Sequence, residues 1–554
     1  MSVLRAAAAR RAQSPRRSVV GRGLAGVLLT FAVLATLQAL TIYPFHPPDE
    51  VSHVGYALEV SHGTLPTIET PIPGHETPLM QHKVNNSRPA NRTIWTANHP
   101  PLYYLVAAVP LRLGVDLGHP VAGIRAARLV NVAIGLAGLV LILLLARELV
   151  PARPELWVGA AGLAALVPTF VQTSAIVYND TLVVILTTAV LLLIARVLRW
   201  GPTRRRLVLL AVLAAAAALT RATGLIAVAA AGLAAVVAVW RHDGRPARTR
   251  AVRAIAAGGA IVVTAAAAAG WFYVRNRHLY GSATGTGALL QKFSRNRRGT
   301  VLQALLGQDF WRGQLRRLWD DSAGPSGTNG VTAWYYLTFV PLLGLTLAGV
   351  RWLRRALPPP NSLLLAWLAG LAVAGLVELG AASFYSLGGT AHGRYLLPAL
   401  SVLAVAAAAG VTGLPGPRAL PLIAALPLLA VVNVIVWQRY LDVTLNPGDG
   451  EHPITHALRV ADLPVWLLAP AAALLATGLA AQAWAVWRLS ALRALPVPVP
   501  ADRPADRLPV PVLADPLADP MPDPMPDPMP DPPADPMPDP PADPPADPRP
   551  AYAG

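Results

Sequence analysis

Long apolar runs, separated by short polar stretches, occupy most of the chain between residues 24 and 487. Each run holds roughly 20 residues, the length of helix that crosses a hydrocarbon core about 30 Å thick. The pattern therefore predicts an all-α polytopic membrane protein with about twelve spans. We place the spans at about 24–43, 123–146, 156–176, 181–198, 206–221, 223–240, 253–271, 332–350, 362–383, 395–412, 419–437 and 463–487.

The composition excludes an ordinary soluble protein. Of the 554 residues, 54% are apolar and only 14% are charged, and the mean hydropathy is +0.46. A soluble chain of this size needs far more polar surface. Cysteine is absent from the sequence, so disulfides, thiolate metal sites and cysteine nucleophiles are all excluded.

Arginines set the orientation of the predicted spans, because short loops rich in Arg stay in the cytoplasm. Both termini are then cytoplasmic, and we expect the first apolar run to be an uncleaved span, since no A-x-A-like signal-peptide site closes it before Tyr43. No nucleic acid is expected as a partner, because the basic charge is distributed between apolar spans. The arginine clusters lie at 5–22, 147–153, 196–206, 241–253, 351–355 and 488–493.

The loops expected on the outer side carry most of the polar residues that could do chemistry. Residues 101–113, PLYYLVAAVPLRL, are apolar but too short to cross, because thirteen helical residues rise about 20 Å. We expect them to form a helix that lies along or dips into the outer membrane surface. The outer loops are 44–122, 177–180, 221–223, 272–331, 384–394 and 438–462.

The last part of the chain is acidic and rich in proline, with Asp at every fourth residue from Asp515 to Asp547. A segment with so few apolar residues to bury is expected to be extended and disordered. It serves either as a solvated linker or as a contact for a basic surface. The chain is thus divided into a basic cytoplasmic N-terminus, a transmembrane module, an outer loop with the last span, and this cytoplasmic tail, at residues 1–23, 24–440, 441–492 and 493–554.

The segment YPFHPPDEVSHVGY, residues 43–56, becomes polar directly after the first apolar run. Pro48 suits the first turn of a helix, with Asp49 and Glu50 near its positive end. His53 then lies on the same helical side as both acids. An acid and an imidazole so placed could take a proton from a hydroxyl group. Alternatively, the acids only favour the helix start and the histidine is solvated.

The element HPPLYY, residues 99–104, repeats the His-Pro-Pro pattern at the far end of the first outer loop. His99 and Tyr103 are candidates for substrate contact or for ordinary placement at the membrane interface. Arg275 opens the second long outer loop within WFYVRNRHLYGSATGTG, residues 271–287. The glycines of this segment do not match the spacing of a nucleotide-binding loop.

Two short outer turns carry opposite charges. Asn179 and Asp180 either form a standard turn or place Asp180 beside Asp49, where the two could share a substrate or a divalent cation. Arg221 lies in LTRATGL, at the tip of a tight hairpin between two predicted spans. An outward arginine could hold a phosphate or extend to lipid headgroups.

The segment SLGGTAHGRYLLPAL brings His392, Arg394 and Tyr395 to the outer start of a later span. Glu378 lies in the preceding span, near its outer end. An acid inside a span is a functional candidate by default, because an unpaired charge in the membrane is costly.

Together, these motifs resemble the GT-C glycosyltransferases. The likeness consists of the acidic pair after the first span, HPPLYY, the Asp at the next outer turn and an outer Arg-Tyr in GRYLLP, and it extends over roughly residues 20–440. More narrowly, the sequence is similar to the protein O-mannosyltransferase and lipid A aminoarabinose transferase branch and its uncharacterised bacterial relatives. The resemblance implies a helical membrane module whose catalytic site faces the outer side of the plasma membrane.

The resemblance also implies roles for the residues. Asp49 would be the base that activates the acceptor, with Glu50 beside it and Asp180 as the second acidic position. Arg221 and Arg394 would bind the lipid phosphate. The implied donor is a sugar on polyprenyl phosphate, reached through the membrane lipids, and the acceptor is a cell-envelope glycan, lipid or protein. A divalent cation is possible but is not required by the sequence, and the implied transfer is inverting.

Two other classes of function stay open on the sequence. A transporter or flippase of lipid-linked glycans would have ionisable residues spread along the spans and repeated broken helices. A non-catalytic scaffold would depend on the acidic tail at residues 501–554, whose eleven Asp and three Arg give it a net charge of −8.

Overall fold

The computed structural model describes residues 2–74, 77–319, 362–412, 419–447 and 450–494. Within these ranges the regular structure is helical, and β pairing is limited to an isolated bridge between Pro71 and Thr93. Residues 1–496 form one compact unit. The predicted span at 332–350 and the predicted disordered tail lie outside the described residues.

Within the described ranges, nine helical segments are long and apolar enough to cross a membrane. The predicted class, an all-α multi-pass membrane protein, is thereby confirmed. The helices that contain these segments are α1 (Ser2–Thr41), α5 (Pro120–Leu149), α8 (Asp180–Trp200), α10 (Gly224–His242), α11 (Ala247–Tyr280), α16 (Ser362–Ser386), η4 with α17 (Gly393–Ala399 and Leu400–Thr412), α18 (Leu420–Leu445) and η5 with α20 (Val465–Leu467 and Leu468–Ala494).

Two predicted spans differ from straight crossings. The span expected at 156–176 is a pair of helices, α6 (Pro154–Ala165) and α7 (Pro168–Ser174), bent by 66°. Pro168 begins the second helix, because a proline cannot continue the hydrogen bonding of the helix before it. The span expected at 206–221 is α9 (Arg204–Ala218), whose 15 residues are short for a straight crossing. The predicted number of twelve spans is therefore tested only in part.

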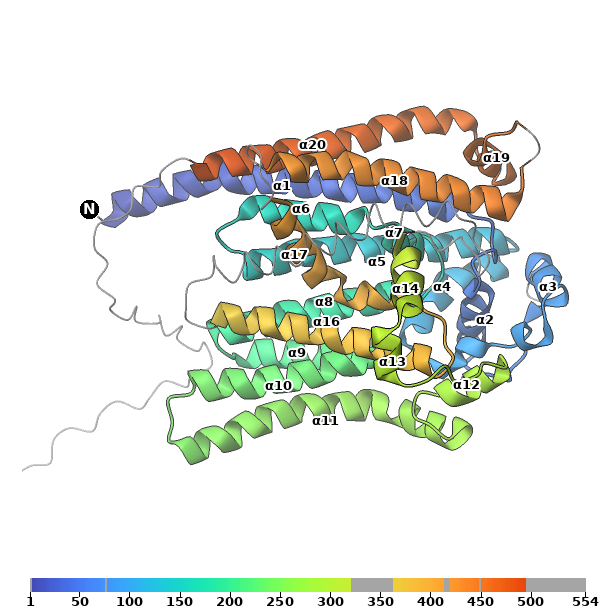
Figure 1. Ribbon diagram of the computed structural model, residues 1–554, viewed down its shortest axis with the longest axis horizontal. Coiled ribbons are helices and arrows are strands. Elements are labelled where there is room, and N and C mark those ends of the chain that lie inside the picture. The colour runs from blue at the N-terminus through green and yellow to red at the C-terminus, as the bar shows by residue number, and fades with distance from the viewer. Residues whose placement is uncertain (1, 75–76, 320–361, 413–418, 448–449, 495–554) are drawn as a thin grey trace, which may run out of the picture. The chain divides into compact units, whose positions relative to one another are not determined.

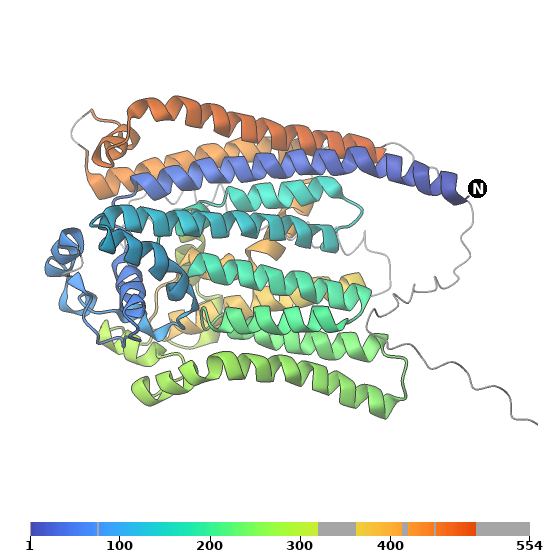
Figure 2. The same ribbon diagram turned by 180° about the vertical axis from the view of Figure 1, so that it is seen from behind.

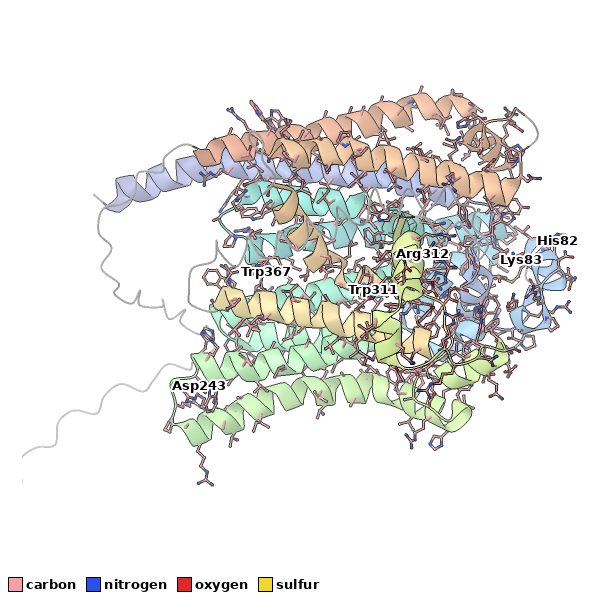
Figure 3. All side chains as sticks on the ribbon, viewed as in Figure 1. His82, Lys83, Asp243, Trp311, Arg312 and Trp367 are labelled. Carbon is pink, nitrogen blue, oxygen red and sulfur yellow. The ribbon has the colours of Figure 1, made fainter. Side chains whose placement is uncertain are left out.

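The long helices run side by side, and their two ends differ in chemistry (Figure 1). One end, the arginine end, carries the loops at 150–153, 201–203 and 243–246 and the N-terminal end of α1. The opposite end, the site end, carries short helices (Figure 2). Asp243 lies at the arginine end, whereas His82 and Lys83 lie at the site end (Figure 3). The site-end helices are α2 (Glu50–Ser61), α3 (Pro78–Asn85), α4 (Leu102–Asp116), α12 (Thr286–Lys292) and α19 (Pro453–Val460), and the 3-10 turns η2 (Pro89–Asn91) and η3 (Trp95–Asn98) lie between α3 and α4.

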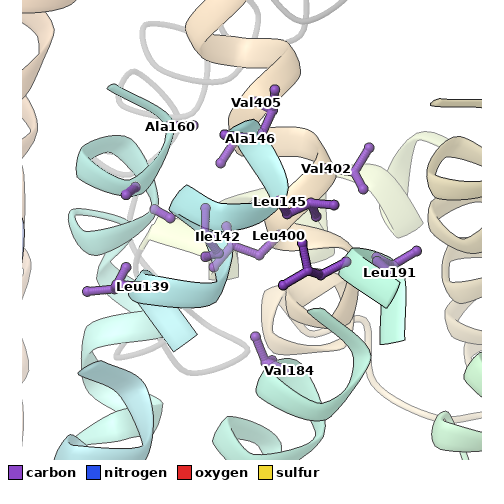
Figure 4. Close-up of a cluster of buried hydrophobic side chains, with 14 of the residues drawn as sticks. Leu139, Ile142, Leu145, Ala146, Ala160, Val184, Leu191, Leu400, Val402 and Val405 are labelled. Atoms are coloured by element: carbon purple, nitrogen blue, oxygen red, sulfur yellow. The ribbon is translucent and has the colours of Figure 1, made fainter. Parts of the chain in front are cut away.

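The core lies where α5, α6, α8 and α17 meet, around side chains such as Ile142, Leu191 and Val405 (Figure 4). Close approach of helices in a membrane depends on small residues rather than on hydrophobic burial. Such an approach joins α1 to α20, where a Cβ on Gly26 would lie 2.6 Å from the carbonyl oxygen of Gly478. Any other residue at Gly26 would therefore push the two helices apart.

Helix α4 is the short helix expected at 101–113. It buries Tyr103 and Tyr104 and packs against α2 and α5. Its opposite face exposes large apolar residues at a spacing of four, which is the pattern of a helix lying in a membrane interface. They are Leu105, Val109, Leu113 and Leu117. Whether α4 lies on the membrane surface or dips into it stays a prediction.

The orientation can be tested by labelling, because the chain has no cysteine and an introduced one is the only thiol. The exposed His82, at the site end, and the exposed Arg248, at the arginine end, are each replaced with Cys. We expect a membrane-impermeant maleimide to label H82C in intact cells and R248C only after permeabilisation. The reverse pattern would place the site end in the cytoplasm.

Candidate active site

Glu50 begins α2 and is fully buried together with Arg128 of α5. The guanidinium donates two hydrogen bonds to the carboxylate, at 2.8 and 2.6 Å, and also binds two carbonyls at the end of α1. The backbone N–H groups of Phe45 and Val177 donate to the same carboxylate at 3.0 and 3.1 Å. Burial raises the pKa of Glu50, but the Arg128 charge and these hydrogen bonds hold it below its usual range. These contacts give Glu50 a positioning role.

Asp49, one residue earlier, has different surroundings. Its carboxylate forms a 2.6 Å ion pair with Arg394 and is 25% exposed. Its backbone N–H donates to the hydroxyl of Tyr178 at 3.0 Å. Burial alone would raise the pKa of this carboxyl, but the charge and hydrogen bond of Arg394 hold it well below its usual range. Asp49 is therefore an ionised carboxylate that solvent or a ligand can reach.

A second ion pair joins Asp180, the first residue of α8, to Arg221, which lies between α9 and α10. The two side chains approach to 2.5 Å. The Arg221 guanidinium also donates to Oδ1 of Asn179 at 3.2 Å, and the Asn179 amide donates to the carbonyl of Thr220. The turn before α8 and the hairpin after α9 are thus held together at the site end.

The two ion pairs meet at Tyr395. The guanidinium carbons of Arg221 and Arg394 each lie 5.6 Å from the centroid of its ring. The structure therefore brings Asp49, Asp180 and both arginines into one cluster of two positive and two negative charges. We call this the charge cluster. His392, whose ring centroid lies 5.6 Å from that of Tyr395, borders it.

His53 lies beside the charge cluster, where the charges of Asp49 and Asp180 both act on its ring. Burial nevertheless lowers the pKa of His53 to about 4, so that the imidazole is neutral at pH 7. Its Nδ1 is 2.9 Å from the hydroxyl of Tyr104, and its ring stacks on His99 with centroids 6.4 Å apart. Burial also lowers the pKa of His99. The first turn of α2 and the start of the second His-Pro-Pro element thus lie together next to the charge cluster.

Packing from neighbouring elements holds the segments that carry these residues. The amide of Asn131 in α5 donates to the carbonyl of Thr173 near the end of α7 and to those of Ile176 and Tyr178 in the turn before α8. Helix α14 (Gln308–Trp319) packs against η4, which carries Arg394. A Cβ on Gly393 would lie 2.2 Å from the backbone N of Leu318, so only glycine fits before Arg394.

Three other predicted site residues make their contacts outside the two ion pairs of the charge cluster. Arg275 donates to the carbonyls of Leu65 and Pro66 and so holds the loop that follows α2. Glu378 accepts a 2.8 Å hydrogen bond from Gln314 of α14. Tyr103 is buried edge-on against Tyr104. Among the described residues, no three His, Cys, Asp or Glu side chains come together to hold a metal ion.

The sequence interpretation missed Arg128 and Asn131. Both lie within the predicted span 123–146, and a polar or ionisable residue inside an apolar run is a signal that it has a partner. Arg128 completes the environment of Glu50, and Asn131 fixes the turn that carries Tyr178.

Fold and charge cluster together define a multi-pass helical membrane protein with an ionic site at one end of its spans. The chain belongs to the family described as predicted membrane protein (DUF2142), whose model matches residues 75–404. No curated protein has a matching sequence. The matched residues include Asp180, Arg221 and Arg394 and begin after Asp49.

The chain is also similar to solved structures, two of which follow. ArnT from Cupriavidus metallidurans bound to undecaprenyl phosphate is 17% identical, with a TM-score of 0.44, over 84% of this chain and 75% of that chain. The archaeal oligosaccharyltransferase AglB from Archaeoglobus fulgidus, in complex with an inhibitory peptide and a dolichol-phosphate, is 14% identical, with a TM-score of 0.36, over 83% of this chain and 56% of that chain. At these TM-scores the likeness carries no argument about activity.

Removing the negative charge of Glu50 should destabilise the protein. Glu50→Gln leaves Arg128 buried without a counter-charge, which costs on the order of 3–5 kcal/mol. We expect a clear fall in the thermal unfolding temperature in detergent. Glu69→Gln is the control, because the Glu69 side chain is 69% exposed. Equal effects of the two substitutions would contradict the positioning role of Glu50.

Acidification should also weaken the fold. His53 has its pKa lowered from 6.5 to about 4 in the folded state, so between these values the unfolded chain binds more protons. Stability is therefore lost as the pH falls from about 6.5 towards 4. The unfolding temperature, measured over this range, should decline less steeply in His53→Gln. An unchanged slope would show that His53 is not buried as a neutral group.

Proposed function

We propose that this protein is a membrane glycosyltransferase that moves a sugar from a polyprenyl-phosphate donor to an acceptor on the extracytoplasmic side, with inversion. The observation that carries the proposal is the charge cluster, in which the pairs Asp49–Arg394 and Asp180–Arg221 meet at one tyrosine ring. It supplies carboxylates for an acceptor and guanidinium groups for a phosphate in the same place. The GT-C resemblance of the motifs agrees with this division of roles.

Arg394 and Arg221 suit the phosphate side of the reaction. When the bond between the sugar and the phosphate breaks, negative charge grows on the departing phosphate oxygens. Guanidinium groups bind such oxygens through paired, charge-assisted hydrogen bonds. Because these donors are already in position, they stabilise the developing charge without reorganisation. Because the site lies at the ends of membrane-spanning helices, the polyprenyl chain of the donor can stay in the lipid while its phosphate reaches the arginines.

Asp49 suits the acceptor side. Its carboxylate accepts the proton of an acceptor hydroxyl, the acceptor oxygen bonds to the anomeric carbon, and the electron pair of the broken bond leaves with the phosphate. While Asp49 is paired with Arg394, its lowered pKa makes it a weak base. A phosphate that binds Arg394 offsets this positive charge and raises the pKa of Asp49. Donor binding would therefore prepare the base.

The neighbouring side chains hold this arrangement. Asp180 orients Arg221 through their ion pair. His53, which is neutral at pH 7, offers a polar ring beside Asp49 without adding a competing charge. The acceptor, a cell-envelope glycan, lipid or protein, would approach from the site end. The Arg-rich loops at the opposite end support a plasma-membrane orientation with both termini in the cytoplasm.

The deciding experiment is Asp49→Asn in the full chain. Transfer of sugar from a polyprenyl-phosphate donor, measured in membranes with a radiolabelled sugar, should fall by on the order of 10²- to 10⁴-fold, because the amide cannot accept the proton. Asp116→Asn is the matched control, since Asp116 is exposed and pairs with Arg112 of the same helix.

The outcomes separate the candidate functions. Unchanged insertion and unfolding temperature with lost transfer supports Asp49 as the base. Full transfer in the Asn variant would remove Asp49 from that role. Movement of an intact lipid-linked sugar across the membrane by the unmodified protein, with no transfer, would support a flippase instead.

A further inference from the structure

An exposed basic segment lies at the site end, where the positive-inside rule predicts few cations. Residues 295–298, with the sequence RNRR, follow α12 and expose all three arginines to solvent. Within the described part of the chain, no carboxylate lies within ion-pair distance of Arg295, Arg297 or Arg298. We call residues 295–298 the arginine segment. Its charge is available for an anion.

The arginine segment is attached to the stretch of chain that leads to the charge cluster. The backbone N–H of Arg298 donates to the carbonyl of Ser386 at 2.9 Å, and its guanidinium lies 4.4 Å from the ring centroid of Tyr385. A Cβ on Gly388 would lie 2.5 Å from the carbonyl oxygen of Asn296, and this glycine has a φ of +110°. Only glycine permits this close approach.

Aromatic contacts connect the same stretch to the charge cluster. Phe384, next to Tyr385, packs edge-on against Tyr395 with ring centroids 5.6 Å apart. Tyr395 in turn carries the guanidinium groups of Arg221 and Arg394 on its ring. Cations and aromatic rings therefore continue from the exposed arginine segment to the charge cluster.

The chain beyond the arginine segment exposes an apolar surface. Thr300 caps α13 (Val301–Leu306), which packs through Ala304 against Ala381 and Ala382 near the outer end of α16. The opposite side of α13 leaves Leu302 and Leu306 65% and 79% exposed. Along α16 itself, large apolar residues are exposed on the membrane-spanning part, at Leu364, Leu368, Leu376 and Leu379. These exposed leucines suit contact with lipid chains.

We propose that the arginine segment captures the phosphate of the polyprenyl-phosphate donor at the membrane surface, before the phosphate reaches Arg394 and Arg221, while the lipid chain lies against α13 and α16. This proposal rests on the proposed function and adds the entry route of its donor. The link to the charge cluster favours the donor over ordinary anionic lipids, because a simple membrane anchor has no need of a fixed connection to the site.

The test measures binding in the full chain, reconstituted in phosphatidylcholine nanodiscs, with undecaprenyl phosphate as the probe. The variant is R295Q/R297Q/R298Q. The matched control is R241Q/R245Q/R248Q, which removes three exposed arginines from the arginine end. Each exposed arginine near a membrane surface contributes roughly fivefold to the binding of an anionic lipid. We therefore expect affinity to fall on the order of tenfold or more in the variant and to stay unchanged in the control.

Two further measurements make the result decisive. An unchanged unfolding temperature, and recovery of affinity in R295K/R297K/R298K, would tie the loss to charge. Equal affinity in the variant and the control would overturn the proposal. Phosphatidylglycerol is the competing probe, and an equal loss for both lipids would show a general anionic-lipid surface, which also overturns it.

Binding and transfer fail separately in this design. If R295Q/R297Q/R298Q loses affinity for undecaprenyl phosphate while Asp49→Asn keeps full transfer, the capture site stands and the assignment of Asp49 as the base is wrong. If Asp49→Asn loses transfer while the variant binds normally, the transferase stands and the capture site is wrong.

Discussion

The ion pair between Asp49 and Arg394 joins parts of the chain that are 345 residues apart. A charge at the boundary of a membrane is costly unless it has a partner or faces water. Here, each guanidinium of the charge cluster lies within reach of a carboxylate, and both rest on one tyrosine ring. Together, the two ion pairs and the ring of Tyr395 fix the turn before α2, the start of α8 and the segment before α17 relative to one another. The chemistry proposed for the site depends on that shared position.

The neighbours Asp49 and Glu50 show how the backbone gives two adjacent acids different roles. The turn before α2 includes Phe45 in a left-handed conformation, with a φ of 66°, and its N–H donates to Glu50. Such a conformation is costly for a non-glycine residue and persists only where its surroundings enforce it. Glu50 is thereby directed into the protein towards Arg128, whereas Asp49 faces the charge cluster. The buried acid holds the turn through Arg128, while the partly exposed one pairs with Arg394 in the charge cluster.

Much of this arrangement is predictable from sequence, for a physical reason. The hydrocarbon core demands apolar runs of a fixed length, so the spans and the polar residues at their ends stand out, among them Asp180, Arg221 and Arg394. The separate roles of Asp49 and Glu50 are not predictable, since they depend on the conformation of one turn. In the sequence, Arg275 and Glu378 look like the residues of the charge cluster. In the structure, however, Arg275 hydrogen-bonds to the carbonyl of Leu65, and Glu378 accepts a hydrogen bond from Gln314.

The contact between α1 and α20 has a consequence for how the protein is made. Thr30 of α1 meets Gln482 at 2.7 Å across 452 residues, next to the close approach at Gly26. During synthesis, α1 enters the bilayer long before α20 leaves the ribosome, so its small and hydroxyl-bearing face first borders lipid. Only arrival of α20 covers that face. A nascent chain halted before α20 would display an unfinished helix surface, which membrane quality control could recognise.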